Sequence, residues 1–319
     1  MLLRKMTKQN SGGKSSDMEG QMLKGKIALV SGASRGIGAG IARELAAQGA
    51  HVVLAARTLN EGEGRNWHAG GPTVPGSLAE NVAHIRASGG SAEPFQIDLR
   101  DKAQIKKMVA HVVAEHGKID ILANCAMGFP ADYKGDIWSS DDTDWDAMME
   151  IGVRSKYLLA HFVSPVMMAQ GHGLIVNISA GASKDEYYSP MFRMAMASVD
   201  RMTSAIAHDL HPHGVSAVSV WPRWVRTERV LMAAENTDLG FDVSSEDLAQ
   251  SDTPEFTGRA IAHLFCDPDL TGRSGRCFPL LELAHHYGFA DIDGIQPPLD
   301  QTSQLWSARL NAIWDILAS

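Results

Sequence analysis

The length and composition of the chain are those of an ordinary globular protein. Its 319 residues suffice for one large α/β domain or two small ones. Hydrophobic residues make up 45% and charged residues 21%, which excludes a disordered or coiled-coil chain. The net charge of -8, from 29 basic and 37 acidic residues, gives no cationic surface, so we expect neither a nucleic acid nor a membrane as partner.

The first 22 residues carry charged groups near both ends and no apolar run of signal-peptide length. We therefore expect residues 1–22 to form a flexible N-terminal tail without an export signal. The three cysteines, Cys125, Cys266 and Cys277, show neither CxxC spacing nor a histidine at metal-ligand spacing. We interpret them as reduced thiols of a cytoplasmic protein.

Short apolar runs alternate with helical patterns along the rest of the chain. Strands are predicted, in order, at 26–32, 51–57, 93–97, 119–124, 174–179 and 216–221. Helices are predicted between them at 37–48, 77–88, 102–117, 145–170 and 190–211. This alternation predicts an α/β fold, a doubly wound parallel Rossmann sheet with helices on both faces. We assign residues 23–319 to a single domain.

Two segments interrupt the alternation. Residues 61–76 are rich in Gly and Pro and longer than the usual connection of about 2–6 residues, which predicts an insertion within the domain. Ser77 and Glu80 then form a capping box that restarts the helix. Residues 226–255 show no regular periodicity and are rich in Met, Asn and Asp, which is typical of a lid over a substrate.

The turn after the first predicted strand has the spacing of a nucleotide-binding loop. It reads Gly-Ala-Ser-Arg-Gly-Ile-Gly over residues 32–38 and leads directly into a helix, the context that the motif requires. Glycines at these places allow a tight turn and close approach of backbone N–H groups to a pyrophosphate, whose charge the helix N-terminus favours. The expected cofactor contacts in this turn are Gly32, Ser34, Arg35, Gly36, Ile37 and Gly38.

With the order of its elements, this GxxxGxG spacing resembles the short-chain dehydrogenase/reductase family over residues 25–227. The resemblance implies further contacts with the dinucleotide. Asp98, followed by Leu99, matches the aspartate that lies near the adenine, and Asn124 matches the first Asn of the family's NNAG segment. The segment that closes over the nicotinamide is matched by Pro222, Val225 and Thr227.

The end of the second predicted strand indicates which dinucleotide binds. Relatives that use NAD place a carboxylate there, which bonds the ribose hydroxyls and would repel a 2′-phosphate. This chain has Ala56 followed by Arg57, and Arg35 lies within the glycine turn. A guanidinium suits a phosphate because it can donate two parallel hydrogen bonds. We therefore expect NADP(H); the alternative is that both arginines are solvated surface residues.

The catalytic positions implied by the resemblance lack the family's residues. Phe192 and Met196 stand at the tyrosine and lysine of YxxxK, where the tyrosine protonates the carbonyl oxygen and the lysine lowers its pKa and holds the ribose. Ala180 stands at the substrate-orienting serine, and Ser179, one residue earlier, is expected to face away. Two further family positions, an asparagine and a glycine, are replaced by Gly152 and Arg223.

Other polar groups could replace the missing acid. Tyr188 lies one residue from Ser189, the position from which enoyl reductases of the same superfamily supply a tyrosine, so a small loop shift would bring its hydroxyl into range. The alternative is that Tyr188 and Tyr187 only line the pocket. Weaker candidates are Tyr133, Asp185, Glu186, His285 and Tyr287. The adjacent His285 and His286 have no HxxxH spacing with a carboxylate, so no metal site is expected.

Two hypotheses of function follow. The first is an NADPH-dependent reductase that transfers a hydride to an activated acceptor, a conjugated C=C, an imine or a carbonyl, by an atypical mechanism with a proton from Tyr188 or water. The second is a catalytically silent NADP(H)-binding protein that senses a ligand or supports a partner subunit. Apolar residues on more than one face of helices 145–170 and 190–211 predict a homodimer or homotetramer.

Overall fold

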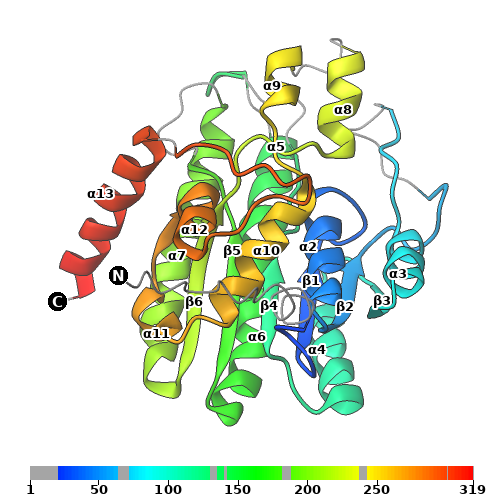
Figure 1. Cartoon of the computed structure of the whole chain (residues 1–319), viewed down its shortest axis with the longest axis vertical. Coiled ribbons are helices and arrows are strands. Elements are labelled where there is room, and N and C mark those ends of the chain that lie inside the picture. Colours follow the sequence, from blue (N-terminus) through cyan, green and yellow to red (C-terminus); the bar gives the residue numbers. More distant parts are fainter. Residues whose placement is uncertain are drawn as a thin grey trace, which may run out of the picture.

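A parallel sheet of seven strands runs through the part of the chain that the structure describes (Figure 1). This computed structural model describes residues 21–63, 72–129, 135–139, 142–181, 188–236, 243–299 and 301–318. The strands are β1 (Ile27–Ser31), β2 (His51–Ala56), β3 (Ser91–Gln96), β4 (Ile121–Asn124), β5 (Gly173–Ile178), β6 (Val215–Trp221) and β7 (Cys277–Pro279). They lie in the order β3-β2-β1-β4-β5-β6-β7, so the direction of winding reverses between β1 and β4.

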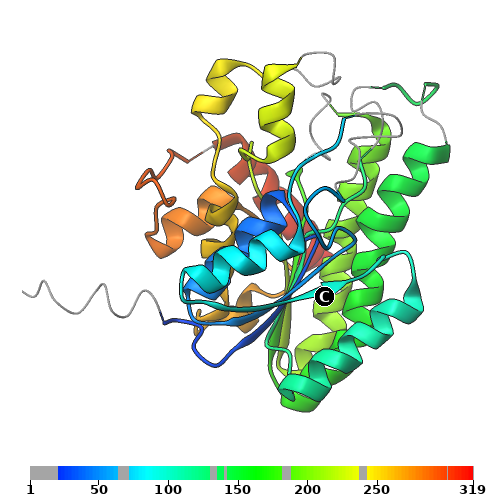
Figure 2. The same ribbon diagram turned by 90° about the vertical axis from the view of Figure 1, so that its right-hand side faces the viewer.

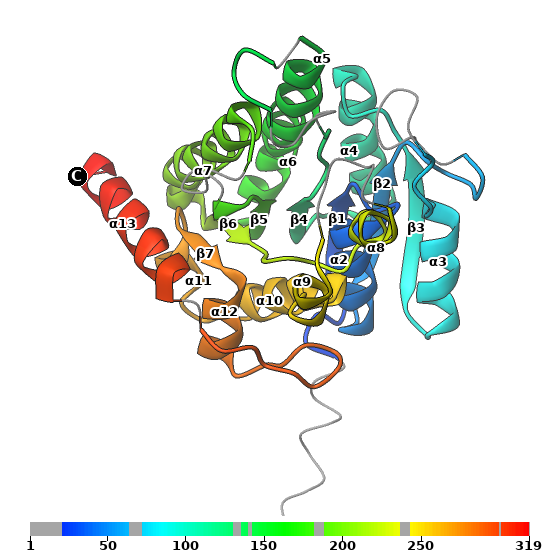
Figure 3. The ribbon, with the colours of Figure 1, turned by 90° about the horizontal axis from the view of Figure 1, so that it is seen from above.

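Helices cover both faces of the sheet (Figure 3). One face carries α2 (Gly36–Ala47), α3 (Leu78–Ala87), α10 (Pro254–Phe265) and α12 (Leu280–Tyr287). The opposite face carries α4 (Lys102–His116), α6 (Ser155–Gln170) and α7 (Pro190–Leu210). The short 3-10 helix His211–His213 follows α7, and α11 (Leu270–Arg273) precedes β7. Beyond α12, α13 (Gln301–Ala318) lies beside the edge strand β7.

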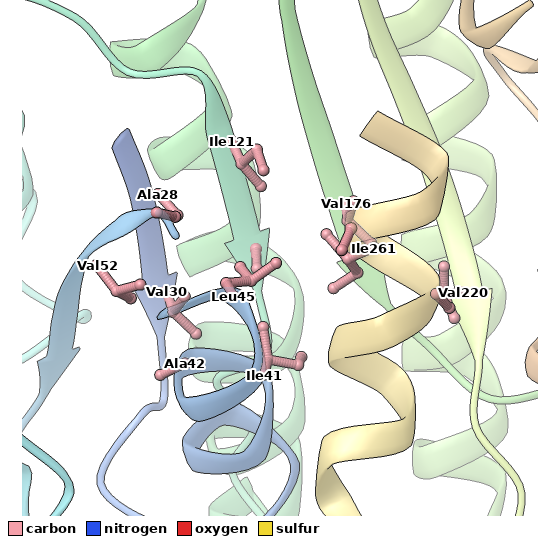
Figure 4. Close-up of a cluster of buried hydrophobic side chains, with 14 of the residues drawn as sticks. Ala28, Val30, Ile41, Ala42, Leu45, Val52, Ile121, Val176, Val220 and Ile261 are labelled. Carbon is pink, nitrogen blue, oxygen red and sulfur yellow. The ribbon is translucent and has the colours of Figure 1, made fainter. Parts of the chain in front are cut away.

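Alternating side chains in the strands explain why both faces need cover. In β1, Ala28 and Val30 pack toward α2, whereas Ile27 and Leu29 pack toward α4 and α6. A strand buried on both faces is apolar throughout, which is why the sequence shows continuous apolar runs. Figure 4 shows the first of these two cores, where side chains of α2 and α10 meet the sheet: Ile41, Leu45 and Ile261 face Val30, Val176 and Val220.

The predicted fold class is confirmed. The six predicted strands and four of the five predicted helices begin and end within two residues of the observed ones. Ser77 caps α3 as expected, since its hydroxyl accepts the N–H of Glu80 at 3.1 Å. The sequence analysis placed no element after residue 221, so β7 and the helices around it are additional.

The fifth predicted helix, 145–170, is not a single α-helix. It consists of α5 (Asp142–Trp145), a π-helix (Asp146–Arg154) and α6, which contains Pro165. A π-helix is wider than an α-helix and is rare outside functional sites. The apolar side chains of this π-helix repeat nearly as they would in an α-helix. The sequence pattern therefore cannot distinguish the two kinds of helix here.

The predicted lid, residues 226–255, contains helices that its sequence pattern did not reveal. Its described residues form α8 (Glu228–Glu235) and α9 (Ser245–Ala249), and α10 begins at its end. Helices this short bury too few side chains to show a periodic pattern of apolar residues in the sequence. Their N-terminal ends are marked by the capping residues Thr227 and Ser244. Figure 2 shows both helices standing above the end of the sheet where the strands finish.

The expectations about the N-terminus and membranes are tested only in part. Residues 1–20 of the predicted tail lie outside the described residues, as do residues 64–71 of the predicted insertion. None of the described helices combines the length and apolar character that crossing a membrane requires.

Candidate active site

A cavity of about 770 Å³ opens where the strands end. Segments following β1 to β6 line it, together with residues of α8 and α9. Because the winding reverses between β1 and β4, this is the position at which open α/β sheets bind ligands. The structure brings together in its wall these candidate residues: Gly32, Ser34, Arg35, Gly36, Ile37, Gly38, Arg57, Asp98, Leu99, Ser179, Tyr188, Phe192, Pro222, Val225 and Thr227. Asn124 and Met196 are not part of it.

The glycine turn packs too closely for side chains at two of its glycines. A Cβ on Gly32, whose φ is +71°, would lie 2.8 Å from the backbone of Ala126, and one on Gly38 would lie 2.4 Å from the carbonyl oxygen of Gly32. The turn leads into α2, whose N-terminus has no side-chain cap. Instead, the N–H of Gly36 donates to Glu228 Oε2 at 2.8 Å. The N-terminus of α2 thus already holds an anionic group, as its dipole favours.

Two arginines line the cavity near the end of β2. The guanidinium of Arg35 donates to the carbonyl oxygen of Gly76 at 2.7 Å, and Arg57 directly follows the strand and is half-buried. Asp98, after β3, accepts hydrogen bonds from Arg100 at 2.5 to 3.1 Å, which hold the pKa of Asp98 below its usual range. Asp98 is therefore paired with Arg100, and Arg35 and Arg57 line the cavity wall beside it.

Asn124 has a structural position. It is fully buried at the end of β4, and its Nδ2 donates to Asn177 Oδ1 on β5 at 2.9 Å. Asn177 Nδ2 donates in turn to Thr203 Oγ1 on α7 at 2.8 Å. This chain of hydrogen bonds joins two strands and a helix behind the cavity.

The cavity wall on the β5 side is aromatic. The ring of Tyr188 stacks on that of Phe192, with centroids 4.7 Å apart and planes 28° apart. Met196, one turn further along α7, is fully buried outside the cavity. Ser179 Oγ donates to the carbonyl oxygen of Met196 on α7 at 3.3 Å, while Ser179 itself lines the cavity, although strand alternation led us to expect it to face away.

Lys156 is a cavity residue that the sequence analysis missed. Its side chain is 1% exposed, and its Nζ donates to the carbonyl oxygen of Ala126, after β4, at 2.6 Å. Burial lowers the pKa of Lys156 to about 8, and burial raises the pKa of the neighbouring Cys125 to about 11. The helical period could have predicted that Lys156 is buried, because it lies on the same face of α6 as the buried residues Ala160, Val163 and Met167.

Comparison with known proteins identifies the family. A family model described as short chain dehydrogenase matches residues 26–71 and 73–238. The chain belongs to the short-chain dehydrogenase/reductase family. It is 32% identical over 281 residues to the mouse (Mus musculus) protein "dehydrogenase/reductase SDR family member 1", with 85% of each chain covered.

Solved structures of the short-chain dehydrogenase/reductase type share this fold. One from Burkholderia xenovorans has a TM-score of 0.66 and 26% identity, covering 81% of this chain and 96% of that one. A metagenomic short-chain oxidoreductase in complex with NADP has a TM-score of 0.59 and 27% identity, covering 78% of this chain and 94% of that one. The family and the fold expected from the sequence are therefore confirmed, and the protein is an oxidoreductase by family.

Phe192 and Met196 are the residues that the sequence resemblance matches to the family's tyrosine and lysine. Phe192 reaches the cavity but carries no proton to donate, and Met196 packs into the core. Groups in the described cavity wall that can hold a proton include the hydroxyls of Tyr188 and Ser179, the thiol of Cys125 and the ammonium of Lys156.

The weaker candidates do not join the described part of the site. Tyr133, Asp185, Glu186 and Tyr187 lie outside the described residues. His285 Nε2 contacts the carbonyl oxygen of Pro297 at 2.8 Å, and the hydroxyl of Tyr287 donates to Asp267 at 2.5 Å. Neither residue is part of the cavity wall.

One group of described residues has metal-ligand chemistry. His51, Glu93 and His116 each bring a ligand atom within 4.8 Å of the others, at the end of the sheet where β2 and β3 begin. His116 Nε2 lies 3.0 Å from Glu93 Oε1, and His51 Nδ1 lies 2.7 Å from Ser91 Oγ. These contacts describe a histidine–glutamate cluster, remote from the cavity at the opposite end of the strands.

Proposed function

We propose that this protein is an NADPH-dependent reductase that transfers a hydride to an activated small-molecule acceptor. The observation that carries this proposal is the cavity at the strand ends, where the glycine turn and the N-terminus of α2 form a cradle for a phosphate. A Cβ at Gly32 or Gly38 would clash with the backbone of Ala126 or with the carbonyl oxygen of Gly32, so the turn keeps this shape only with glycine there. The fit of the cradle to a dinucleotide supports a reductase that depends on a nicotinamide cofactor.

The charges beside β2 support NADP(H) over NAD(H). Arg35 and Arg57 line the cavity, and Ala56 stands where a carboxylate would oppose a 2′-phosphate. Asp98 is neutralised by Arg100. A bound 2′-phosphate would therefore meet guanidinium groups without an opposing free carboxylate from these residues. The similar metagenomic oxidoreductase in complex with NADP is consistent with this choice.

When bound, NADPH supplies a hydride from its nicotinamide ring. The chain's part is to position the acceptor and exclude water, and the stacked rings of Tyr188 and Phe192 supply an apolar wall for both tasks. Because Phe192 cannot donate a proton, the acceptor must need little acid catalysis, as a conjugated C=C, an imine or an activated carbonyl does. We assign the proton to the hydroxyl of Tyr188, with water as the alternative.

The test is steady-state oxidation of NADPH with an enone, an imine and a ketone. The unmodified protein should reduce the enone or the imine faster than the ketone. Tyr188→Phe should slow this reaction by about 10²-fold or less, the lower end of what a general acid contributes, because the acceptor needs little acid catalysis. Tyr157→Phe, which changes a tyrosine on α6 that is 52% exposed, is the matched control and should leave the rate unchanged. Equal rates for Tyr188→Phe and the unmodified protein would exclude Tyr188 as the donor.

The burial of Met196 favours a second candidate function, a catalytically silent NADP(H)-binding protein that senses a ligand or supports a partner subunit. Oxidation of NADPH by the unmodified protein separates the two functions, and Phe192→Tyr with Met196→Lys tests whether the cavity can still align an acceptor with the cofactor. If the cavity still aligns acceptor and cofactor, the pair should create ketone reduction, with Ala180→Ser added to orient the carbonyl. Binding of NADPH without its oxidation by any acceptor would favour the silent protein. For both functions we propose a small-molecule ligand, a cytoplasmic location and a homodimer or homotetramer.

A further inference from the structure

Lys156 is a buried cation without a counter-charge in the described structure. The described residues give its Nζ a single hydrogen-bond acceptor, the carbonyl oxygen of Ala126 at 2.6 Å, and no carboxylate within ion-pair distance. An ammonium carries three N–H donors, so two remain to be satisfied by what enters the cavity. Lys156 lines that cavity although its side chain is only 1% exposed.

Packing alone does not account for a lysine here. Burial disfavours its charge and lowers the pKa of Lys156 to about 8, and Cys125, the one described titratable group whose charge shifts that pKa, is itself a neutral thiol. Methionine fills similar space without a charge, as Met148 and Met167 do nearby on the same stretch of helix. An uncompensated buried charge points to a ligand that makes use of it.

The position of Lys156 relative to the strands indicates which half of a dinucleotide it faces. Ala126 follows β4 and lies against Gly32 of the glycine turn. Arg57 and Asp98 follow β2 and β3, on the other side of β1. A dinucleotide bound across the switch point has one half on each side. Lys156, on α6 behind β4 and β5 (Figure 3), therefore belongs to the half that holds Phe192, where hydride leaves the cofactor.

We propose that the ammonium of Lys156 makes the cavity select the reduced cofactor, because it repels the positive nicotinamide of NADP⁺ and does not repel the neutral ring of NADPH. This inference rests on the proposed use of NADP(H), and it names the residue that decides which form of the cofactor the cavity binds more tightly. Lys156 keeps the oxidised product weakly bound, so that it leaves and fresh NADPH replaces it.

The test measures binding and needs no turnover. The dissociation constants of NADPH and NADP⁺ are determined by calorimetric titration at pH 6.5 for the unmodified protein and for Lys156→Met, Lys156→Arg and Lys107→Met. A unit charge several ångströms away in a partly polar interior should change the affinity ratio at least about tenfold. Lys156→Met should therefore tighten NADP⁺ relative to NADPH by at least about tenfold, which is about 30 mV in the potential of the bound couple.

The controls separate charge from shape. Lys156→Arg keeps the charge and should keep the preference for NADPH, and Lys107→Met, at an exposed lysine on α4, should leave both constants unchanged. Thermal melting of each variant shows whether it is folded. In the unmodified protein the preference should fall between pH 7 and pH 9, as Lys156 loses its proton near pH 8. In Lys156→Arg the preference for NADPH should stay the same over this pH range, because a guanidinium stays charged.

The outcomes distinguish this inference from the proposed function. If the unmodified protein binds neither nucleotide, the proposed function fails. If it binds both and Lys156→Met leaves their ratio as it was, the role of Lys156 is wrong while the proposed function stands. If Lys156→Met weakens both nucleotides equally, Lys156 holds a part common to the two, and selection of the reduced cofactor is again excluded.

Discussion

Replacing Lys156 by methionine should stabilise the protein at neutral pH. The change of the pKa of Lys156 from 10.5 in the unfolded chain to about 8 in the folded protein corresponds to about 3 kcal/mol of unfavourable free energy for the charged form. Methionine removes that cost but also the hydrogen bond to the carbonyl oxygen of Ala126, worth about 1 kcal/mol. We therefore expect the free energy of unfolding to rise by about 2 kcal/mol.

The gain should depend on pH in a defined direction. Because the folded protein holds the proton of Lys156 less tightly than the unfolded chain, the unmodified protein gains stability as the pH rises from 8 to 10.5. The advantage of Lys156→Met should thus be complete at pH 7 and smaller at pH 9.5. Urea unfolding curves at the two pH values measure it, with Lys107→Met as the control.

A clear loss of stability in Lys156→Met at pH 7, with Lys107→Met unchanged, would refute this reasoning. It would show that the ammonium is compensated within the folded chain and is retained for stability. A gain, by contrast, would mean that the protein tolerates a destabilising charge in its cavity wall, as enzymes do at functional sites.

Three further predictions follow from other residues. Burial raises the pKa of Asp200 to about 6, so the folded protein favours the protonated carboxyl. The protein therefore loses stability as the pH rises toward 6 and Asp200 becomes charged in its buried site. Asp200→Asn should therefore add up to about 3 kcal/mol in unfolding experiments at pH 7.5 and almost nothing at pH 4. Arg57→Asp should reverse the preference for NADPH over NADH, whereas equal affinities of the unmodified protein for both would contradict the role of Arg57. Tyr157 and Met194 are exposed on the two long helices, so light scattering should find an oligomer at micromolar concentration, and Tyr157→Glu should weaken it. A monomeric unmodified protein would exclude the predicted homo-oligomer.

The order of the sheet could be predicted because each of its main strands leaves a strong local signal. Val52 and Leu54 face one core and Val53 and Ala55 the other, so β2 appears in the sequence as an unbroken apolar run. The glycine turn is equally local, since both the strand and the helix that it needs adjoin it. Such features depend on neighbours in the chain and not on distant contacts.

Other parts of the site depend on contacts between distant residues. Asn124 matches a family motif, yet its amide bonds Asn177, 53 residues away, and this partner decides that it lies behind the cavity. Lys156 stands in the first turn of an apolar helix, whose period places it on the buried side, but only the position of Ala126 shows that its ammonium reaches the cavity. The π-helix before it changes which side chains face inward without altering the apolar pattern.

The hydrogen bond from the N–H of Gly36 to Glu228 joins the glycine turn to α8. A phosphate that accepts the N–H of Gly36 must displace the carboxylate of Glu228, the first residue of α8. The free energy of cofactor binding is then less favourable by the free energy of the Gly36–Glu228 hydrogen bond. By reciprocity, a bound cofactor weakens the attachment of α8 to the glycine turn by the same free energy. Binding of a phosphate at the glycine turn and the position of α8 would therefore be thermodynamically coupled through a single backbone N–H group.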